Sequence, residues 1–230
     1  MAHNTVIARL GIVAWLGGFI LFFAAQFVVG AAWSDPPYSW SHNNVSDLGN
    51  VYCQLWEENG NSAQYVCSPL HALMNIAFVL EGLCVIAGVL MIRALWRRSW
   101  LSRIAQAFLI IAGLGLIAAG LAPADVNENA HVVLGALPIA LFGNAGLMLT
   151  GRGVSASAVG KLRWVGPVLG LVGIIATALF LAHHDLGLGS GGMERLWGYN
   201  FLVWTFIIGC SLAYQSFRPE SAERASTLPH

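Results

Sequence analysis

The chain has 230 residues, of which 57% are hydrophobic and only 10% are charged. Its 11 Lys and Arg residues balance its 11 Asp and Glu residues, so the formal net charge is zero. Soluble domains carry about 25% charged residues, so this composition excludes an ordinary soluble domain. Zero net charge excludes a nucleic-acid-binding protein that works through bulk positive charge, and the apolar content excludes a disordered chain. A polytopic membrane protein remains.

Six stretches of the chain hold about 20 mostly apolar residues, the length that an α-helix needs to cross a bilayer. Their apolar character is continuous, whereas a lipid-facing β-strand alternates apolar and polar residues. We therefore predict an all-α fold with six transmembrane helices in one bundle. The bundle forms a single domain over residues 1–217, and residues 218–230 form a disordered tail. The expected spans are residues 10–33, 69–92, 104–122, 131–150, 164–182 and 196–214.

The positive residues indicate the orientation of these spans. With six spans, ten of the 11 Lys and Arg residues fall on one side of the membrane, and only Arg195 falls on the other. Loops rich in Lys and Arg stay in the cytoplasm. We therefore expect both termini in the cytoplasm and place the protein in a bacterial inner membrane. Five of the seven histidines fall on the outer side or at the outer ends of helices.

Residues 34–68 form the one long outer loop. It contains Cys53 and Cys67, which this topology exposes to an oxidising compartment. Paired cysteines there predict a disulfide. The alternative is a redox pair or a metal–thiolate site, but the chain has no Cys-x-x-Cys pattern to support it. The aromatic residues of this loop are expected to anchor it at the membrane interface, with a lid over an outward-opening site as the alternative.

Two groups of polar residues flank the start of the second span. Asp47, in the run Ser46-Asp47-Leu48-Gly49, either caps a short interfacial helix or supplies a carboxylate to an outward-facing pocket. His71 and Asn75 lie four residues apart, which places both on one face of the helix. In a membrane helix such a face is expected to point into the bundle, and an interhelical hydrogen bond is its simplest role.

Two further groups open the fourth and sixth spans. Glu128 and His131 lie three residues apart, and this spacing puts both on one helix face, as in metal sites of helix bundles. Capping of the helix N-terminus explains Asp125 but does not explain His131. Glu194 and Arg195 follow a glycine-rich stretch. Arg195 either forms an ion pair that holds helices together or binds an anionic headgroup or phosphate.

Ionisable side chains within membrane spans are costly and therefore mark candidate functional sites. Histidines with carboxylates suit zinc or another divalent metal. The predicted metal ligands are His71, His131, His183 and Asp185; the predicted catalytic residues are Asp47, His71, Glu128 and His131; the predicted substrate-binding residues are Ser46, Asn75, Glu194 and Arg195. Glu81 stands apart near mid-membrane, where we expect it to be protonated or paired.

Several of these residues carry a resemblance to a known family. The run Val45 to Gly49, Met74-Asn75, Glu128-x-x-His131 and Gly192-Met193-Glu194-Arg195 together resemble the bacterial and archaeal membrane family catalogued as domain of unknown function 998. The resemblance covers nearly the whole chain, and Ser-Asp-Leu-Gly is its most specific element. The chain departs from the family pattern at Met74, where an aromatic residue often stands, and in its long outer loop with cysteines. The resemblance implies six spans and no known reaction.

A looser similarity connects the residue types to alkaline-ceramidase-like and progestin-receptor-like membrane hydrolases. Those proteins have seven spans and use Ser, Asp and three His residues around a zinc ion. This chain has six expected spans and lacks their paired His-x-x-x-His. The similarity is an analogy of site chemistry, and fold or composition alone does not transfer a function.

Two classes of function fit these observations. The first is a metal-assisted hydrolase or binder of a lipid or amphiphile, in which a metal-bound water is the nucleophile. The second is a non-enzymatic accessory subunit or chaperone of a larger membrane complex, such as a lipid transporter, in which the polar groups only fix helix packing. Glycines at regular spacing in the third and fifth spans favour close helix contacts within or between chains. A transporter ranks third, because no expected span shows a broken helix with facing charges.

Overall fold

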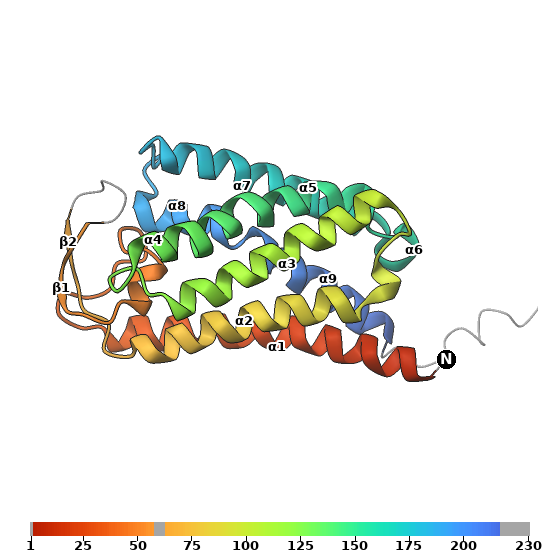
Figure 1. The fold of residues 1–230 in the computed structure, drawn as a ribbon, viewed down its shortest axis with the longest axis horizontal. Coiled ribbons are helices and arrows are strands. Elements are labelled where there is room, and N and C mark those ends of the chain that lie inside the picture. Colours follow the sequence, from red (N-terminus) through yellow and green to blue (C-terminus); the bar gives the residue numbers. More distant parts are fainter. Residues whose placement is uncertain (1, 58–62, 217–230) are drawn as a thin grey trace, which may run out of the picture.

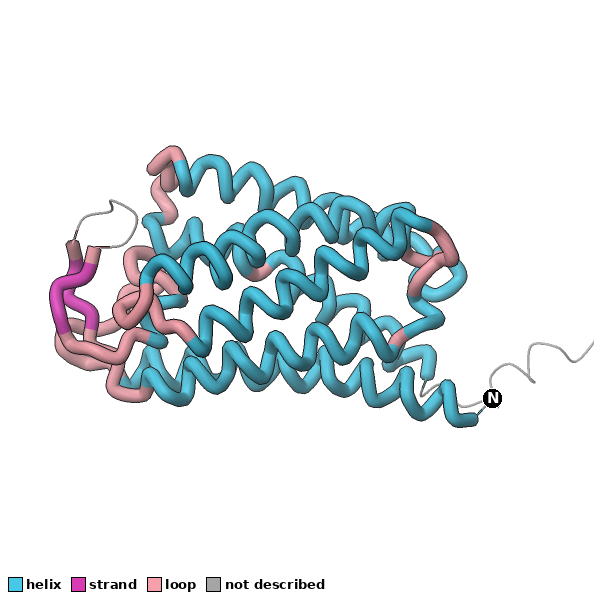
Figure 2. The backbone as a smooth tube through the Cα atoms, viewed as in Figure 1, coloured by secondary structure: helices cyan, strands magenta, loops and turns pink. Residues whose placement is uncertain are grey.

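The structure is a computed structural model that describes residues 2–57 and 63–216, so the expected tail lies outside the described residues. Long helices run side by side along the longest dimension of the molecule (Figure 1). A loop with a small antiparallel hairpin covers one end (Figure 2). The longer helices are α1 (Ala2–Ala32), α2 (His71–Met91), α3 (Trp100–Leu121), α5 (Asn144–Gly153), α7 (Val165–Leu181), α8 (Gly189–Gly198) and α9 (Asn200–Ser216). The shorter elements are β1 (Gln54–Trp56), β2 (Gln64–Val66), α4 (Glu128–Ala130) and α6 (Ala156–Val159).

The predicted membrane fold is confirmed. In the described part of the chain, five helical segments are long and apolar enough to cross a membrane, and α8 with α9 makes a sixth if the bent pair counts as one span. The five are Thr5–Ala32, His71–Met91, Trp100–Leu121, Glu128–Gly153 and Ala156–Leu181. All six correspond to expected spans. A continuous apolar stretch of about 20 residues is stable as a helix that crosses a bilayer, so hydropathy is enough to locate it.

The two ends of the bundle differ in composition. The basic loops after α2 and after α5 lie together, since the backbone N–H of Arg97 donates to the carbonyl of Gly153 at 2.9 Å. The guanidinium of Arg9 donates to the carbonyl of Ser216 at 3.1 Å, so α1 begins where α9 ends. The hairpin lies at the opposite end (Figure 1). Both described ends of the chain therefore lie at the basic end, as an even number of spans requires.

The glycine-rich faces of the spans pack against one another within the chain. A Cβ on Gly82 of α2 would overlap the carbonyl oxygen of Gly113 on α3, and a Cβ on Gly170 of α7 would lie 2.6 Å from the carbonyl oxygen of Asn144. Close backbone approach of this kind is how small residues stabilise helix pairs in membranes. The glycine spacing thus serves contacts between α2 and α3 and between α5 and α7.

The fourth span is wound unusually. Between α4 and α5, the segments η3 (His131–Ala136) and η4 (Pro138–Gly143) are π-helical. A π-helix is wider than an α-helix and is frequent at functional sites. Pro138 has no backbone N–H to donate, which removes one hydrogen bond of the regular ladder. The predicted span is therefore present, but its side chains face different directions from those of an ideal α-helix.

The sixth span is broken, and the break falls inside the expected stretch of residues 196–214. Helix α8 meets α9 at an angle of 47°. Carbonyls freed at a break must find donors inside a membrane protein. Here Asn200 Nδ2 donates to the carbonyl of Leu196 at 2.7 Å, and Asn144 Nδ2 donates to that of Trp197 at 3.0 Å. Asn144 comes from α5, so a second span supports the bend. The glycine-rich stretch from residue 189 to 192 forms the first turn of α8.

The predicted disulfide between Cys53 and Cys67 is confirmed. It lies beside the β1–β2 ladder, in which Gln54 pairs with Val66. A covalent link restricts the unfolded loop and so stabilises the ordered one. The hairpin is therefore held in one shape at the end of the bundle.

Replacing Asn144 by Leu tests the bend between α8 and α9. The variant leaves the carbonyl of Trp197 without its donor, and we expect a loss of about 1–2 kcal/mol in the free energy of unfolding. The measurement is thermal denaturation in detergent. Thr205→Val is the matched control, because Thr205 donates only to Leu202 within its own helix. Equal stability of the two variants would contradict this account of the bend.

Candidate functional site

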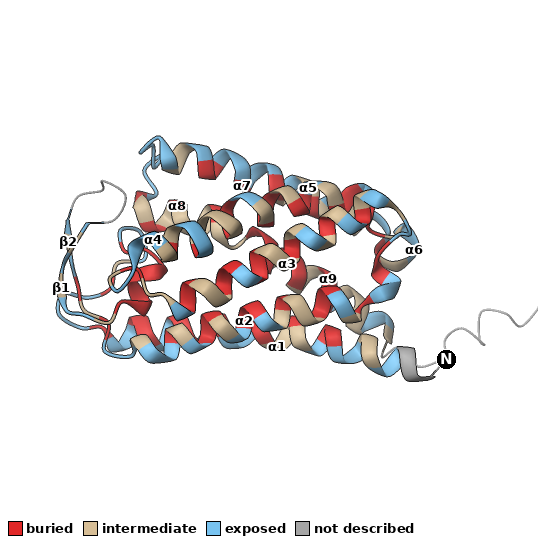
Figure 3. Cartoon of the chain, in the orientation of Figure 1, coloured by how far each residue is buried: buried red, intermediate tan, exposed pale blue. Residues whose placement is uncertain are grey.

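The end of the bundle that carries the hairpin, which we call the outer end, is closed by residues 38–50, which we call the outer plug. Residues 43–50 are all buried, although they form a loop with one short 3-10 helix, η1 (Ser46–Gly49). This short helix is coloured as buried in Figure 3. Loops normally run over a protein surface because buried backbone groups need partners. The outer plug enters the end of the bundle, so its backbone groups must bond to the surrounding helices.

Asp47 fixes the fold of the outer plug. Its carboxylate Oδ2 accepts from the backbone N–H of Asn44 at 2.9 Å and from Asn43 Nδ2 at 3.2 Å. The N-cap residue of η1 is Val45, which makes no side-chain cap hydrogen bond. The Asp47 carboxylate therefore holds the turn that leads into η1 by bonding to the two asparagines before it.

Helix α2 holds the outer plug from one side. Asn75 Nδ2 donates to the carbonyl of Gly49 at 2.9 Å, and Ser68 Oγ, just before the helix, donates to the carbonyl of Leu48 at 2.7 Å. His71 Nδ1 lies 3.1 Å from the carbonyl of Ser68. A Cβ on Gly49 would overlap the side-chain oxygen of Asn75. Of the two residues predicted on this face of α2, Asn75 thus binds backbone of the outer plug, and His71 contacts the residue three before it in its own segment.

Helix α8 holds it from the other side through Arg195. Its Nη1 donates to three backbone carbonyls: Trp40 at 2.8 Å, Asn43 at 3.0 Å and Gly191 at 2.8 Å. Its Nη2 donates to the hydroxyl of Tyr38. The guanidinium also lies 5.2 Å from the centre of the Trp40 ring, within the range of a cation–π contact. One side chain therefore ties α8 to backbone and aromatic groups of the outer plug.

Two neighbours complete this junction. The carboxylate of Glu194 accepts from the backbone N–H of Val45. Burial raises the pKa of the Tyr38 hydroxyl above its ordinary value, and the nearby guanidinium of Arg195 opposes the shift only in part. Tyr38 therefore remains protonated and donates to the carbonyl of Asn44 at 2.8 Å. Tyr38 was not among the predicted site residues, because an interfacial tyrosine in a sequence resembles an ordinary membrane anchor.

The predicted histidines lie at other points of the outer end. His131 is buried, and its Nδ1 lies 2.9 Å from the carbonyl of Ala122, so it closes the turn between α3 and α4. Glu128 is exposed. His183 and Asp185 are exposed in the turn after α7, where Asp185 accepts from the N–H of Gly187 at 2.9 Å.

The predicted metal ligands are not brought together. Over residues 2–57 and 63–216, no group of three or more His, Cys, Asp or Glu side chains is arranged to hold a metal ion. His71, His131, His183 and Asp185 therefore do not form one ligand set in this structure. The predicted residues that do converge are those bound to or part of the outer plug: Ser46, Asp47, Asn75, Glu194 and Arg195. His71 lies beside the outer plug, at Ser68.

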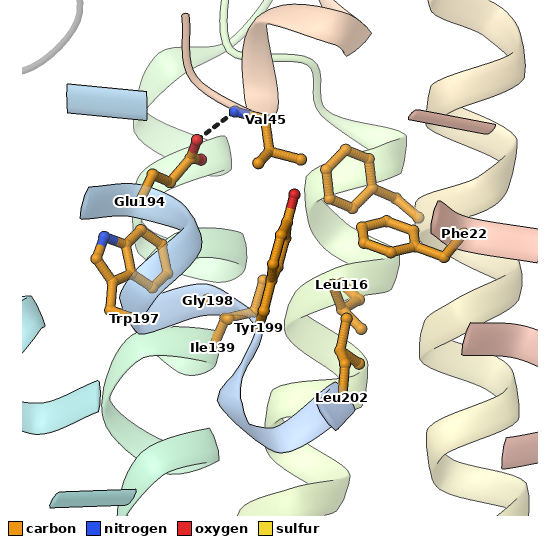
Figure 4. A pocket seen from close by; sticks show the side chains of 10 residues that line it. Phe22, Val45, Leu116, Ile139, Glu194, Trp197, Gly198, Tyr199 and Leu202 are labelled. Carbon is orange, nitrogen blue, oxygen red and sulfur yellow. Dashed lines mark hydrogen bonds between the residues drawn. The ribbon is translucent and has the colours of Figure 1, made fainter. Parts of the chain in front are cut away.

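Two apolar pockets lie on either side of α8, and Glu194 and Trp197 line both. The first, which we call the inner pocket, opens among Phe22, Phe78, Leu116, Ile139, Tyr199 and Leu202 (Figure 4). The second, the lateral pocket, lies between fourth-span residues Val132, Ala136 and Ala140 and α7 residues Thr177, Phe180 and Leu181. Sequence analysis missed both, because their apolar linings look like any membrane core.

Glu81 lies away from this site. It is buried on α2 against Gly18 of α1, and among the described residues neither of its carboxyl oxygens has a hydrogen-bond partner. A bare carboxylate is costly in such surroundings. Of the two expected states, the geometry therefore favours the protonated one.

Replacing Arg195 by Lys tests the junction between α8 and the outer plug. An ammonium lacks the planar fork that reaches several carbonyls at once, so we expect a loss of about 2 kcal/mol in stability and faster proteolysis within residues 38–50. Thermal denaturation and limited proteolysis in detergent measure the two effects. Arg9→Lys, at the basic end, is the control. An outer plug that stays resistant in Arg195→Lys would show that other contacts hold it.

Comparison with known proteins identifies the family. No curated protein and no solved structure matches the chain. A family model described as a protein of unknown function (DUF998) matches residues 16–211. The match includes the outer plug and the residues of α2 and α8 that hold it. The chain therefore belongs to the DUF998 family.

Proposed function

We propose that this protein binds a membrane lipid or another amphiphile at the outer end of its bundle. The apolar part of the ligand occupies the lateral pocket, and its polar part lies against the outer plug. The observation that carries the proposal is the lining of the lateral pocket, which is apolar along two membrane spans and ends at Asn44 and Glu194. A site with one long apolar wall and a polar end suits a molecule built in the same way.

The route into the lateral pocket supports a ligand that comes from the bilayer. Leu181 lines the pocket and is 59% exposed, and Val133 and Leu134, beside the lining residue Val132, are exposed as well. On a membrane span, exposed apolar side chains face lipid. An acyl chain can therefore pass from the bilayer into the pocket between the fourth span and α7 without crossing polar groups.

The same proposal includes an orientation in a bacterial inner membrane. The basic loops and both described ends of the chain lie at one end of the bundle, and such an end stays in the cytoplasm. The disulfide lies at the other end, where an oxidising compartment favours it. The lateral pocket then opens toward the outer leaflet.

A hydrolytic step stays a prediction. Asp47 and His71 bond to backbone in and beside the outer plug, and His131 bonds to the turn after α3. Each of these contacts accounts for its residue as a positioning group. Binding of an amphiphile needs only the pocket and its polar end, so it is the function that the geometry supports best.

Filling the lateral pocket tests the proposed function. We expect Ala136→Trp to lower the amount of bound lipid at least about tenfold, because the indole takes the space of an acyl chain. Cross-linking of a photoactivatable lipid to the purified protein in nanodiscs measures this. Leu141→Trp is the matched control, since it adds the same ring to an exposed apolar position of the same span that lines neither pocket. Unchanged cross-linking in a folded Ala136→Trp variant would contradict the proposal.

One observation favours the accessory-subunit function as a second candidate. Leu55 and Tyr65 lie opposite each other in the β1–β2 ladder and are 73% and 42% exposed. The hairpin stands beyond the ends of the helices (Figure 2). Exposed apolar pairs on a rigid element outside the bilayer are typical of protein contact surfaces.

Changing Leu55 and Tyr65 together to Ser tests this second function. If the hairpin docks a partner, native gel electrophoresis of mild detergent extracts shows a complex for the wild type and only the free protein for the variant. The bundle itself is expected to keep its thermal stability, because neither side chain is buried. Free protein in both extracts would remove the support for this candidate.

A further inference from the structure

The end of the bundle opposite the hairpin carries most of the positive charge of the chain (Figure 1). The charge lies on two segments, residues 92–103 where α2 leads into α3 and residues 152–164 where α5 leads into α7. Together they hold seven of the 11 Lys and Arg residues, six of them exposed and one half-buried. We call these seven the basic face: Arg93, Arg97, Arg98, Arg103, Arg152, Lys161 and Arg163.

The basic face has no acidic residues around it to neutralise its charge. Neither of its two segments contains Asp or Glu. The described chain ends that meet at the same end of the bundle, residues 2–9 and 210–216, contain none either. The cations therefore repel one another, and an anion from outside the described chain lowers their electrostatic energy.

Backbone contacts fix the two segments against each other. The N–H of Ser155 donates to the carbonyl of Leu95 at 2.8 Å. Next to this bond, Trp96 and Val154 pair in an antiparallel bridge. These contacts add to the hydrogen bond between Arg97 and the other segment described above. The segments therefore cannot move apart to relieve the repulsion, and they present their cations as one surface.

Two tryptophans indicate the depth of the basic face in the membrane. Trp100 begins α3 and is 69% exposed, and Trp164 directly precedes α7 and is 50% exposed. Exposed tryptophans at the ends of membrane spans lie at the level of the lipid headgroups. The guanidinium of Arg163 lies 5.1 Å from the centre of the Trp164 ring. This cation is therefore at the level where lipid phosphates lie.

We propose that the basic face binds anionic phospholipids of the leaflet on its side of the membrane, through their phosphate groups. Six of its seven residues are arginines, whose planar guanidinium matches the geometry of a phosphate. Soluble phosphate esters share this chemistry, but they lack the acyl chains that keep a phosphate at the level of Trp100 and Trp164. The basic face lies at the opposite end from the outer plug, so this inference is independent of the proposed function.

The test measures which lipid the purified protein retains. Native mass spectrometry is applied to protein taken from micelles with equal amounts of phosphatidylglycerol, which is anionic, and phosphatidylethanolamine, which is zwitterionic, both with the same chains. For the wild type we expect about a tenfold preference for phosphatidylglycerol. Arg97→Gln and Arg152→Gln, each alone, are expected to lower this preference by a factor of about three or more. Arg9→Gln is the matched control, because it removes one cation from the same end but outside the basic face.

Each outcome decides a different point. Equal retention of the two lipids by the wild type overturns the inference, and this result needs no variant. A preference that survives in both variants, or that Arg9→Gln lowers as strongly, overturns the assignment to the basic face. Displacement of phosphatidylglycerol by millimolar glycerol 3-phosphate overturns a lipid as the source of the phosphate. Ala136→Trp is expected to keep the preference, so the proposed function and this inference can fail separately.

Discussion

The structure depends on one constraint: a loop with buried backbone closes the outer end of a membrane bundle, and Arg195 supplies donors to two of its carbonyls. The carbonyls of Trp40 and Asn43 and the hydroxyl of Tyr38 converge on this guanidinium, which also bonds to Gly191 in its own helix. An unpaired carbonyl is costly in such a place, so α8 must sit where Arg195 can reach all of them. The position of α8 in turn creates the inner and lateral pockets, because Glu194 and Trp197 separate the two.

The bend in the sixth span accompanies the contact between α8 and the outer plug. Arg195, which binds the outer plug, and Trp197, which lines both pockets, lie on α8, the part of the span that meets α9 at 47°. The break frees carbonyls inside the bundle, and Asn144 and Asn200 satisfy them. Polar side chains within the spans thus donate hydrogen bonds to backbone carbonyls even without a ligand, as expected where irregular backbone lies inside a membrane protein.

Hydropathy and motif spacing predict the depth of a residue in the membrane well, but they predict its position around the bundle axis poorly. Apolar stretches give the spans, and the position of a residue within its stretch gives its depth, so the outer location of Asp47, Asn75 and Arg195 follows from the sequence. Depth carries no information on where a helix stands around the bundle axis. His131 and His183 are both expected near the same end of the bundle, yet His131 lies at the turn after α3 and His183 lies in the turn after α7. The bend at Tyr199 was equally hidden, because the side chain that supports it, Asn144, comes from another span.

The order in which the chain is made has a consequence for assembly. The outer plug follows directly after α1, whereas the guanidinium that satisfies it lies 152 residues after Asn43 and 155 after Trp40. Contacts of such sequence separation form late, because the loop between the partners must close first. During synthesis the carbonyls of Trp40 and Asn43 therefore lack this donor until almost every span has been made. A chain that stops before α8 keeps the contacts of the outer plug with α2 but lacks those with Arg195.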